Sequence, residues 1–475
     1  MHDSSLKVQK NKEYSGSVKE MTLIAFPMIV SYACDMAMIF VDRIFLSKLG
    51  SLRMNAALGG GMASFLLGTF FLGLVGYSTV LVAQYFGSKQ KNKCAIVVTQ
   101  GLLISLAAYP LILCCKPLIL ILFQHSGIDP RQLEYQCVYF NIIVFSAIFM
   151  LLRSSLSGFF CGIGKTKVVM FSAGISMVVN IILNYLLIFG KFQFPALGIK
   201  GAAIGTVVGS FVGVLILFVA YLKKKNVQEF RLLSSFIFNK QVMGKLLRFG
   251  YPSGVELFIN FSAFTGMMFL FHAQNAVVAT ASTIMINWDM VSFVPLLGVE
   301  IGVMSLVGRY MGAGKPSVAR RSTLSGLKIG SVYSIFVFIL FMFFPEQLVN
   351  LFRPDIANDI YQKAFPIAVS MLRIACLYVL LETVICSLVG ALRGAGDTFW
   401  AMCLTVGLHI SVVLVEFICL KIFNFSVEKT WFVMIISFFL GALLIYLRYA
   451  SGRWQNIKVV DEANKITLID GFHET

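Results

Sequence analysis

Twelve apolar runs of helix-spanning length follow one another along the chain. A helix of about 20 apolar residues crosses the roughly 30 Å of hydrocarbon in a bilayer. With 58% apolar residues and a mean hydropathy of +0.85, the chain is too hydrophobic for a soluble globule. We therefore predict an all-α polytopic membrane protein with twelve transmembrane helices. The spans are expected at roughly 21–44, 56–86, 95–116, 135–160, 168–190, 199–222, 249–273, 278–308, 323–345, 364–392, 399–420 and 430–448.

The distribution of basic residues predicts the orientation of these spans. An even number of spans puts both termini on one side, and the connections on that side are rich in Lys and Arg, with Arg393 among them. The opposite connections hold few basic residues and include Asp355 and Asp359. An excess of basic residues marks the cytoplasmic side. We expect a cell (inner) membrane protein with cytoplasmic tails at 1–20 and 451–475, and the net charge of +17 needs no nucleic-acid partner.

The two halves of the chain share sequence motifs in the same order. Pro27 corresponds to Pro252 at an offset of 225, and VAQYFGSK (82–89) corresponds to VGRYMGAG (307–314) at the same offset. Further on, SLSGFFCGIGKT (155–166) corresponds to SLVGALRGAGDT (387–398) at an offset of 232. Three ordered matches predict an internal duplication of a six-helix unit.

The repeat predicts the domain organisation. We expect an N-lobe at 21–222, a cytoplasmic linker at 223–245 and a C-lobe at 246–450, related by an axis along the membrane normal. In transporters built from such repeats, substrate and ion sites lie near the bilayer midplane at the repeat interface.

Acidic residues inside the spans are the main functional candidates. A charge in hydrocarbon is costly unless it faces protein, water or a counter-ion, so intramembrane acids mark ion or substrate pathways. The alternative is a structural ion pair, for instance with Arg153 or Arg373. Glu300 is a weaker candidate, and Glu416 is expected to extend toward Lys421. The candidate cation-binding acids are Asp35, Asp42, Glu256, Asp289 and Glu382.

Amides and aromatic residues near these acids complete the expected site. Asn260 stands eight residues after Pro252, as Asp35 does after Pro27, and is a further candidate cation-binding residue; Glu256 lies one turn before it. Asn180 and Asn184 share one helix face and could coordinate an ion or bridge helices. Aromatic and thioether side chains suit flat organic cations, although plain helix packing explains such a stripe equally well. The candidate substrate-binding residues are Asn180, Asn184, Phe258, Phe261, Trp288 and Met290.

Motifs of enzymes and ATP-driven pumps are missing from the sequence. There is no H-E-x-x-H, P-loop or dinucleotide motif of useful quality, and the ten cysteines form no C-x-x-C. We therefore expect no enzymatic activity, no cofactor and no metal site. The energy for transport would come from an Na⁺ or H⁺ gradient.

The chain resembles the multidrug and toxic compound extrusion family over about 20–450, with the NorM-type branch the most similar in pattern. The resemblance rests on Val41-Asp42, Leu49-Gly50 and four longer motifs: VAQYFGS, NYLLIFGKFQFPALGIKGAAIGT, VPLLGVEIGVMSLVGRYMGAG and SLVGALRGAGDT. It implies a monomer of two six-helix lobes forming a V, which exports organic cations in exchange for Na⁺ or H⁺.

The resemblance also implies roles for single residues. Asp42 matches the aspartate of the first span, Asn180 matches the asparagine of the fifth, and Glu382 matches a cation-binding acid of the tenth. Asn260 stands where the NorM-type branch has a glutamate, and Glu256 is the candidate substitute. Asn184 stands where some members have an aspartate.

Two other functions remain open from the sequence. A flippase of the same superfamily, moving a lipid or a lipid-linked oligosaccharide, would favour several basic residues in the cavity, and deep basic residues are few here. A channel or a membrane-bound enzyme is disfavoured by the two-lobe repeat and by the missing catalytic motifs.

Overall fold

The computed structural model describes residues 16–125, 129–353 and 359–461, and within these ranges the chain is helical without strands. Twelve helical segments are long and apolar enough to cross a membrane, as predicted. The first half comprises α2 (Val18–Ser47), α3 (Ser51–Gly76), α4 (Ser78–Gly87), α5 (Lys91–Gln124), α6 (Pro130–Ile143), η1 (Val144–Ser146), α7 (Ala147–Gly162), α8 (Lys167–Phe189) and α9 (Ile199–Tyr221). The connection holds α10 (Lys224–Phe230) and η2 (Leu232–Ser234).

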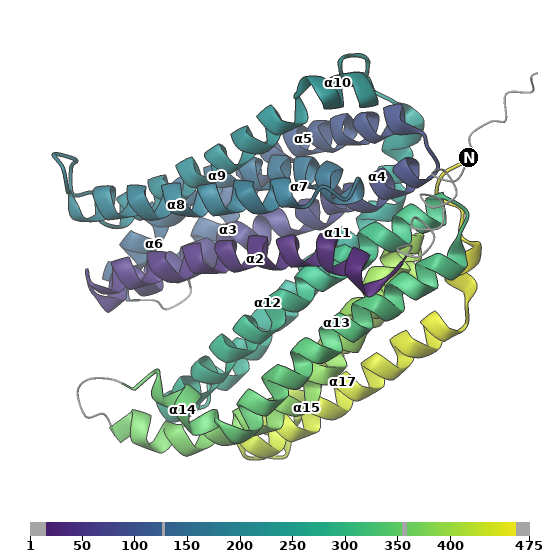
Figure 1. The fold of residues 1–475 in the computed structure, drawn as a ribbon. Coiled ribbons are helices and arrows are strands. Elements are labelled where there is room, and N and C mark those ends of the chain that lie inside the picture. The colour runs from purple at the N-terminus through teal and green to yellow at the C-terminus, as the bar shows by residue number, and fades with distance from the viewer. Residues whose placement is uncertain (1–15, 126–128, 354–358, 462–475) are drawn as a thin grey trace, which may run out of the picture.

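The second half repeats this order of helices. It comprises α11 (Lys240–His272), α12 (Ala276–Gly312), α13 (Pro316–Phe343), α14 (Pro345–Asn350), α15 (Asp359–Ala395), α16 (Thr398–Phe417), the π-helical turn η3 (Ile418–Ile422), α17 (Val427–Ala450) and η4 (Arg453–Asn456). Figure 1 shows two arms, one with α2, α3 and α5–α9 and the other with α12, α13, α15 and α17. The arms meet near the N-terminus and diverge at the opposite end, which gives the expected V.

Local sequence signals explain where several helices begin and end. The side chains of Ser17, Asn239 and Asn275 cap α2, α11 and α12 by accepting a hydrogen bond from the backbone N–H three residues later. Such caps satisfy N–H groups that a helix leaves unpaired. Gly190 ends α8 in a left-handed conformation, with φ of 66°.

The polar connections differ in detail from the predicted linker and tails. Helix α11 begins at Lys240, inside the segment predicted as linker, because its first turns extend beyond the apolar run. In the segment predicted as C-terminal tail, Trp454 and Val459 are buried against the helices. The lobe boundaries at 21–222 and 246–450 stay predictions.

The two halves meet through close backbone contacts, and these contacts are made by residues that are equivalent in the internal repeat. A Cβ added to Gly87 of α4 would lie less than 3.0 Å from the carbonyl oxygen of Arg309. A Cβ added to Gly312 of α12, the repeat equivalent of Gly87, would lie equally close to the carbonyl oxygen of Gln84. The side-chain amide of Gln84 also donates to the carbonyl oxygen of Gly394 at 2.9 Å. The converging end of the V is therefore held by closely packed backbone.

We expect Gly87→Ala to lower the stability of this packed form by about 1–3 kcal/mol, because the added methyl group must displace the backbone at Arg309. Thermal unfolding of the purified protein in detergent measures the change. Gly407→Ala in α16 is the matched control: no heavy atom lies within 4 Å of its added Cβ, so alanine should be neutral or mildly stabilising. Equal melting temperatures for the two variants would contradict the close contact.

Candidate functional site

A cavity of about 390 Å³ lies among helices α11, α12, α15, α16 and α17 of the second half. Its size is typical of a site for a small organic molecule. The wall is mostly apolar and includes Phe261, Phe264, Met267, Met290, Phe293, Trp431 and Phe438. The polar and charged lining residues are Glu256, Asn260, Asp289, Glu300, Tyr378, Glu382, Arg393, Thr405 and His409.

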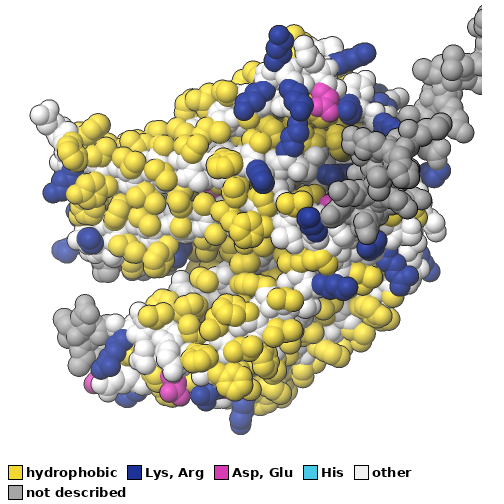
Figure 2. Space-filling view, in the orientation of Figure 1, with side chains coloured by type: hydrophobic (Ala, Val, Ile, Leu, Met, Phe, Trp, Pro, Cys, Tyr) yellow, Lys and Arg dark blue, Asp and Glu magenta, His cyan; other side chains and the backbone are white. Residues whose placement is uncertain are grey.

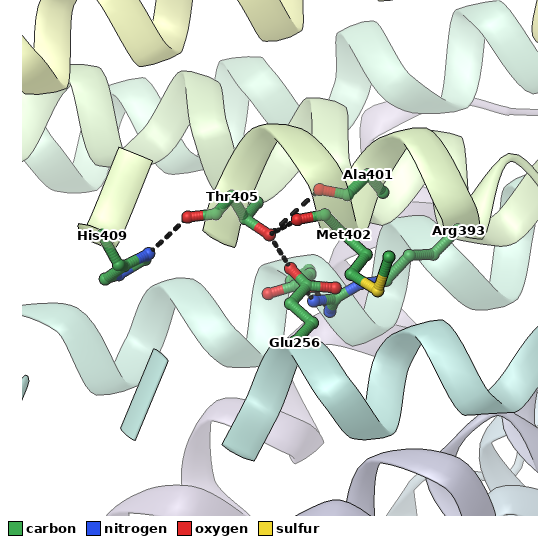
Figure 3. A network of polar contacts seen from close by, with 7 residues as sticks. Glu256, Arg393, Ala401, Met402, Thr405 and His409 are labelled. Carbon is green, nitrogen blue, oxygen red and sulfur yellow. Dashed lines mark hydrogen bonds and ion pairs between the residues drawn. The ribbon is translucent and has the colours of Figure 1, made fainter. Parts of the chain in front are cut away.

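Arg393 binds two of the cavity's carboxylates at once. Its Nη2 lies 2.6 Å from Oε1 of Glu256, and its Nη1 donates to Oε1 of Glu300. Thr405 also donates to Glu256, and Nδ1 of His409 donates to the backbone oxygen of Thr405 at 2.8 Å. Figure 3 shows Glu256 between Thr405 and Arg393. Glu256 therefore already has a protein counter-ion, which it shares with Glu300.

The role of Arg393 differs from the sequence prediction. We expected it in a connection on the side of the termini, but α15 continues to Ala395, so Arg393 is a helix residue. Its long side chain extends from the last turns of α15 into the cavity. The neighbouring glycines in ALRGAGDT favoured the reading as a turn, which is why the sequence did not predict this contact.

Asp289 and Glu382 form a second acidic group in the same cavity. The Tyr378 hydroxyl donates to Oδ1 of Asp289 at 2.5 Å, and Glu382 follows Tyr378 by one turn of α15. Oε2 of Glu382 is buried without a hydrogen-bond partner. Across the described ranges, neither carboxylate has Lys or Arg within ion-pair distance. Two acids without a protein counter-ion form a place where a cationic ligand would be stabilised.

Asn260, Phe261 and Met290, three of the predicted site residues, line the cavity, and their binding roles stay predictions. Oδ1 of Asn260 is buried without a hydrogen-bond partner and is free to accept one from a ligand. Phe261 packs edge-to-face on Phe65 of the first half, with ring centroids 5.0 Å apart. One wall of the cavity is therefore in contact with the other arm.

Phe258 and Trp288, also expected at the cavity, do not line it. Phe258 lies two residues before Asn260, about 200° around α11, and its side chain is 42% exposed. Trp288 lies on the other side of α12 from Phe293, and its indole N–H donates to the backbone oxygen of Leu348 at 3.1 Å. Trp431 and Phe438 of α17 add to the aromatic surface, although no sequence signal marked them.

The predicted polar residues of the first half form a separate buried cluster. Asp42 accepts hydrogen bonds from Asn184 and from Thr206, the latter at 3.1 Å. Asn184 also donates to Asn180 at 3.3 Å, and Asn180 donates to Thr206 at 3.3 Å. Both asparagines are fully buried in this cluster, and neither lines the second-half cavity. Thr206 is a further member of this cluster. It was not predicted, because a single threonine in a span is not a sign of a functional site.

Asp35 and Glu416 have surroundings that argue against a simple cation site. Asp35 forms two hydrogen bonds with Arg153, at 2.9 and 3.0 Å, which is the ion pair that the sequence left open. Glu416 is fully buried, and neither of its carboxylate oxygens has a partner among the residues described, so the expected contact with Lys421 is wrong. Arg373 pairs with Glu346 at 3.4 Å and not with an acid of the cavity.

Comparisons with known proteins agree with this fold. The MatE family model matches residues 27–186 and 252–418, one segment in each half. A probable multidrug resistance protein NorM from Thermotoga maritima is 26% identical over 93% of this chain and 94% of its own length. The NorM of Pasteurella multocida is 27% identical over 92% and 94%, respectively.

Solved structures of similar fold are also transporters. One is described as the outward-facing conformation of a multidrug resistance MATE family transporter of the MOP superfamily; it has a TM-score of 0.84 at 20% identity and covers 93% of this chain and 97% of its own. A MATE protein in the straight conformation gives a TM-score of 0.83 at 20% identity over the same shares. The curated relatives are named as probable multidrug resistance proteins and this solved structure as a transporter, and none of these names is that of an enzyme. The chain belongs to the MatE family of multidrug efflux transporters.

Proposed function

We propose that the protein is an antiporter that exports amphipathic, mostly cationic organic compounds in exchange for Na⁺ or H⁺. The observation that carries the proposal is the pair Asp289 and Glu382, two carboxylates without a basic partner in the described chain. They face an aromatic and thioether wall that would cover the apolar part of such a compound. No cofactor is required, because the ion gradient supplies the energy.

Competition for the same carboxylates would couple the two cations. An organic cation or Na⁺ would pair with the ionised carboxylates of Asp289 and Glu382, and a proton would neutralise them, so binding of the coupling ion lowers the affinity for the substrate and the reverse. Asn260 contributes an acceptor at this site, and Asp42 with its amide cluster is a second candidate ion site in the first half. Glu256 and Asp35 are occupied by Arg393 and Arg153, which makes them less suited to direct ion binding.

Alternating access would follow from the V of the two arms. The cavity-bearing arm diverges from the other at one end, while the backbone contacts at Gly87 and Gly312 close the opposite end. We propose that the closed end faces the cytoplasm of a cell (inner) membrane, with both termini on that side, and that the protein acts as a monomer. An anionic, lipid-linked cargo is not favoured, because Arg393, the Arg that lines the cavity, is held by two glutamates.

Transport by purified protein in proteoliposomes tests this function. Ethidium serves as substrate, and Na⁺ and H⁺ gradients are imposed separately at zero membrane potential. We expect one gradient to drive ethidium movement against its concentration and the other to have little effect. An ionophore that dissipates the effective gradient should stop transport. If ethidium uptake without any ion gradient equalled the uptake with one, antiport would be contradicted, and a channel or a flippase would be favoured.

A further inference from the structure

The connection between the two halves is held rigidly, yet it exposes large apolar side chains. The amide of Gln100 donates to the backbone oxygen of Ile237 at 2.8 Å and accepts from the backbone N–H of Asn239 at 3.1 Å. Phe230 and Leu232 are buried beneath this segment. Leu233, Phe236 and Phe238 nevertheless point outward, with side chains 76%, 50% and 66% exposed. Their exposure is fixed by the fold.

Exposed basic residues flank these apolar side chains in the sequence. Glu229, the acid of this connection, forms an ion pair with Lys91 at 2.9 Å. The exposed basic residues of the connection form no salt bridge among the described residues. They are Lys223, Lys224, Lys225, Arg231 and Lys240.

The position of the connection places it at a bilayer surface. It joins the ends of α9 and α11, both membrane-spanning candidates, and so lies where the hydrocarbon ends. Figure 2 shows basic side chains gathered over α10, next to the hydrophobic surface of the arm below. Gln100, which holds this segment, belongs to the membrane-spanning candidate α5, so the exposed apolar residues lie beside a helix that enters the bilayer. Basic residues at the edge of an inserted apolar surface attract anionic lipids.

We propose that residues 223–240 form a binding site for anionic lipid headgroups in the leaflet on the side of the termini. Leu233, Phe236 and Phe238 insert among the acyl chains, while Lys223–Lys225, Arg231 and Lys240 contact the phosphates. Lipid binding at this site would hold residues 223–240 at the membrane surface. Because these residues join the two arms, it would also affect how the arms move relative to each other.

Tryptophan fluorescence tests the insertion of the apolar residues. Phe236→Trp is conservative, since the side chain is half exposed, and the signal of the four native tryptophans is subtracted with the unsubstituted protein. Lipids brominated on their acyl chains quench only a tryptophan that enters the bilayer. We expect the added tryptophan to be quenched, and more strongly when the brominated lipid is phosphatidylglycerol than when it is phosphatidylcholine at the same mole fraction. No added quenching overturns insertion, and equal quenching by both lipids overturns the anionic preference.

Charge variants in the Phe236→Trp background test the headgroup contacts. Replacing Lys223, Lys224 and Lys225 by Gln should lower the preference for phosphatidylglycerol by about tenfold or more. The matched control replaces Lys315, Arg320 and Arg321 by Gln, which removes three charges from the same side of the second half and should keep the preference. If both triple variants lose the preference for phosphatidylglycerol, a local site is overturned. If both keep it, the lysine contacts are overturned. Millimolar inorganic phosphate should not compete; competition would indicate a phosphate site and overturn the lipid assignment.

Discussion

Arg393→Met is expected to destabilise the protein by roughly 3–5 kcal/mol, because Glu256 and Glu300 lose their shared counter-ion. Both side chains are largely buried, with 1% and 8% exposure, so water solvates their charges poorly once the guanidinium is removed. Helices α11, α12 and α15 carry the three residues, and the loss therefore loosens the packing around the cavity. Thermal unfolding in detergent at neutral pH measures the effect.

Two further variants separate lost charge balance from lost packing. Arg393→Met combined with Glu300→Gln removes one unpaired charge and should recover a substantial part of the stability. Arg373→Met is the matched control, because the Arg373–Glu346 pair is more than half exposed and such pairs contribute about 0–1 kcal/mol. If Arg393→Met were no less stable than Arg373→Met, the bridge to the two glutamates would not be a stabilising element.

Glu382→Gln should abolish ion-coupled efflux while leaving the protein folded. Glutamine has nearly the same shape as glutamate but cannot carry the charge that a coupling ion or an organic cation needs. Because no salt bridge to Glu382 exists in the described structure, the substitution breaks no ion pair. Loss of one charge-assisted contact, worth about 1.5–3 kcal/mol, should weaken cation binding by roughly 10- to 100-fold. Ethidium transport under the effective gradient and equilibrium binding measure the two effects.

Two substitutions provide the comparison for Glu382→Gln. Glu346→Gln removes an exposed charge outside the cavity and should retain full transport. Glu256→Gln should lower stability, since it removes a partner of Arg393, and it should impair transport less than Glu382→Gln does. Full ethidium efflux by Glu382→Gln would remove this residue from the coupling site.

The fold could be predicted from the sequence because a bilayer allows few solutions. Apolar runs of spanning length predicted twelve helices, and the matches at Pro27 and Pro252 predicted two similar halves. Length, polarity and repetition are all properties of the chain itself. Helix ends were less predictable, because α5 and α11 extend several residues into polar sequence where neither lipid nor composition marks a boundary.

The rotation of each helix could not be predicted in the same way. In a soluble protein the buried face is apolar and the outer face polar, but lipid is as apolar as the core. Phe258 and Phe261 therefore have equivalent sequence signals, although only Phe261 lines the cavity. Glu382 and Asp289 were identified because an acid in a span is informative wherever it points. Arg393 was missed because a basic residue near a helix end usually faces water.

The glycine contacts between the halves have a consequence for how the two arms can move. Gly87 meets Arg309 and Gly312 meets Gln84, so each half offers its partner the same surface, as the subunits of a twofold homodimer do. The Gly87–Arg309 and Gly312–Gln84 contacts must therefore separate together, and neither half stays in place while the other moves. If Asp42 in the first half and Glu382 in the second both bind cations, as proposed, both binding events would act on this one contact region. A duplicated chain can therefore differ in side-chain chemistry between its halves while both halves keep the same part in the contact.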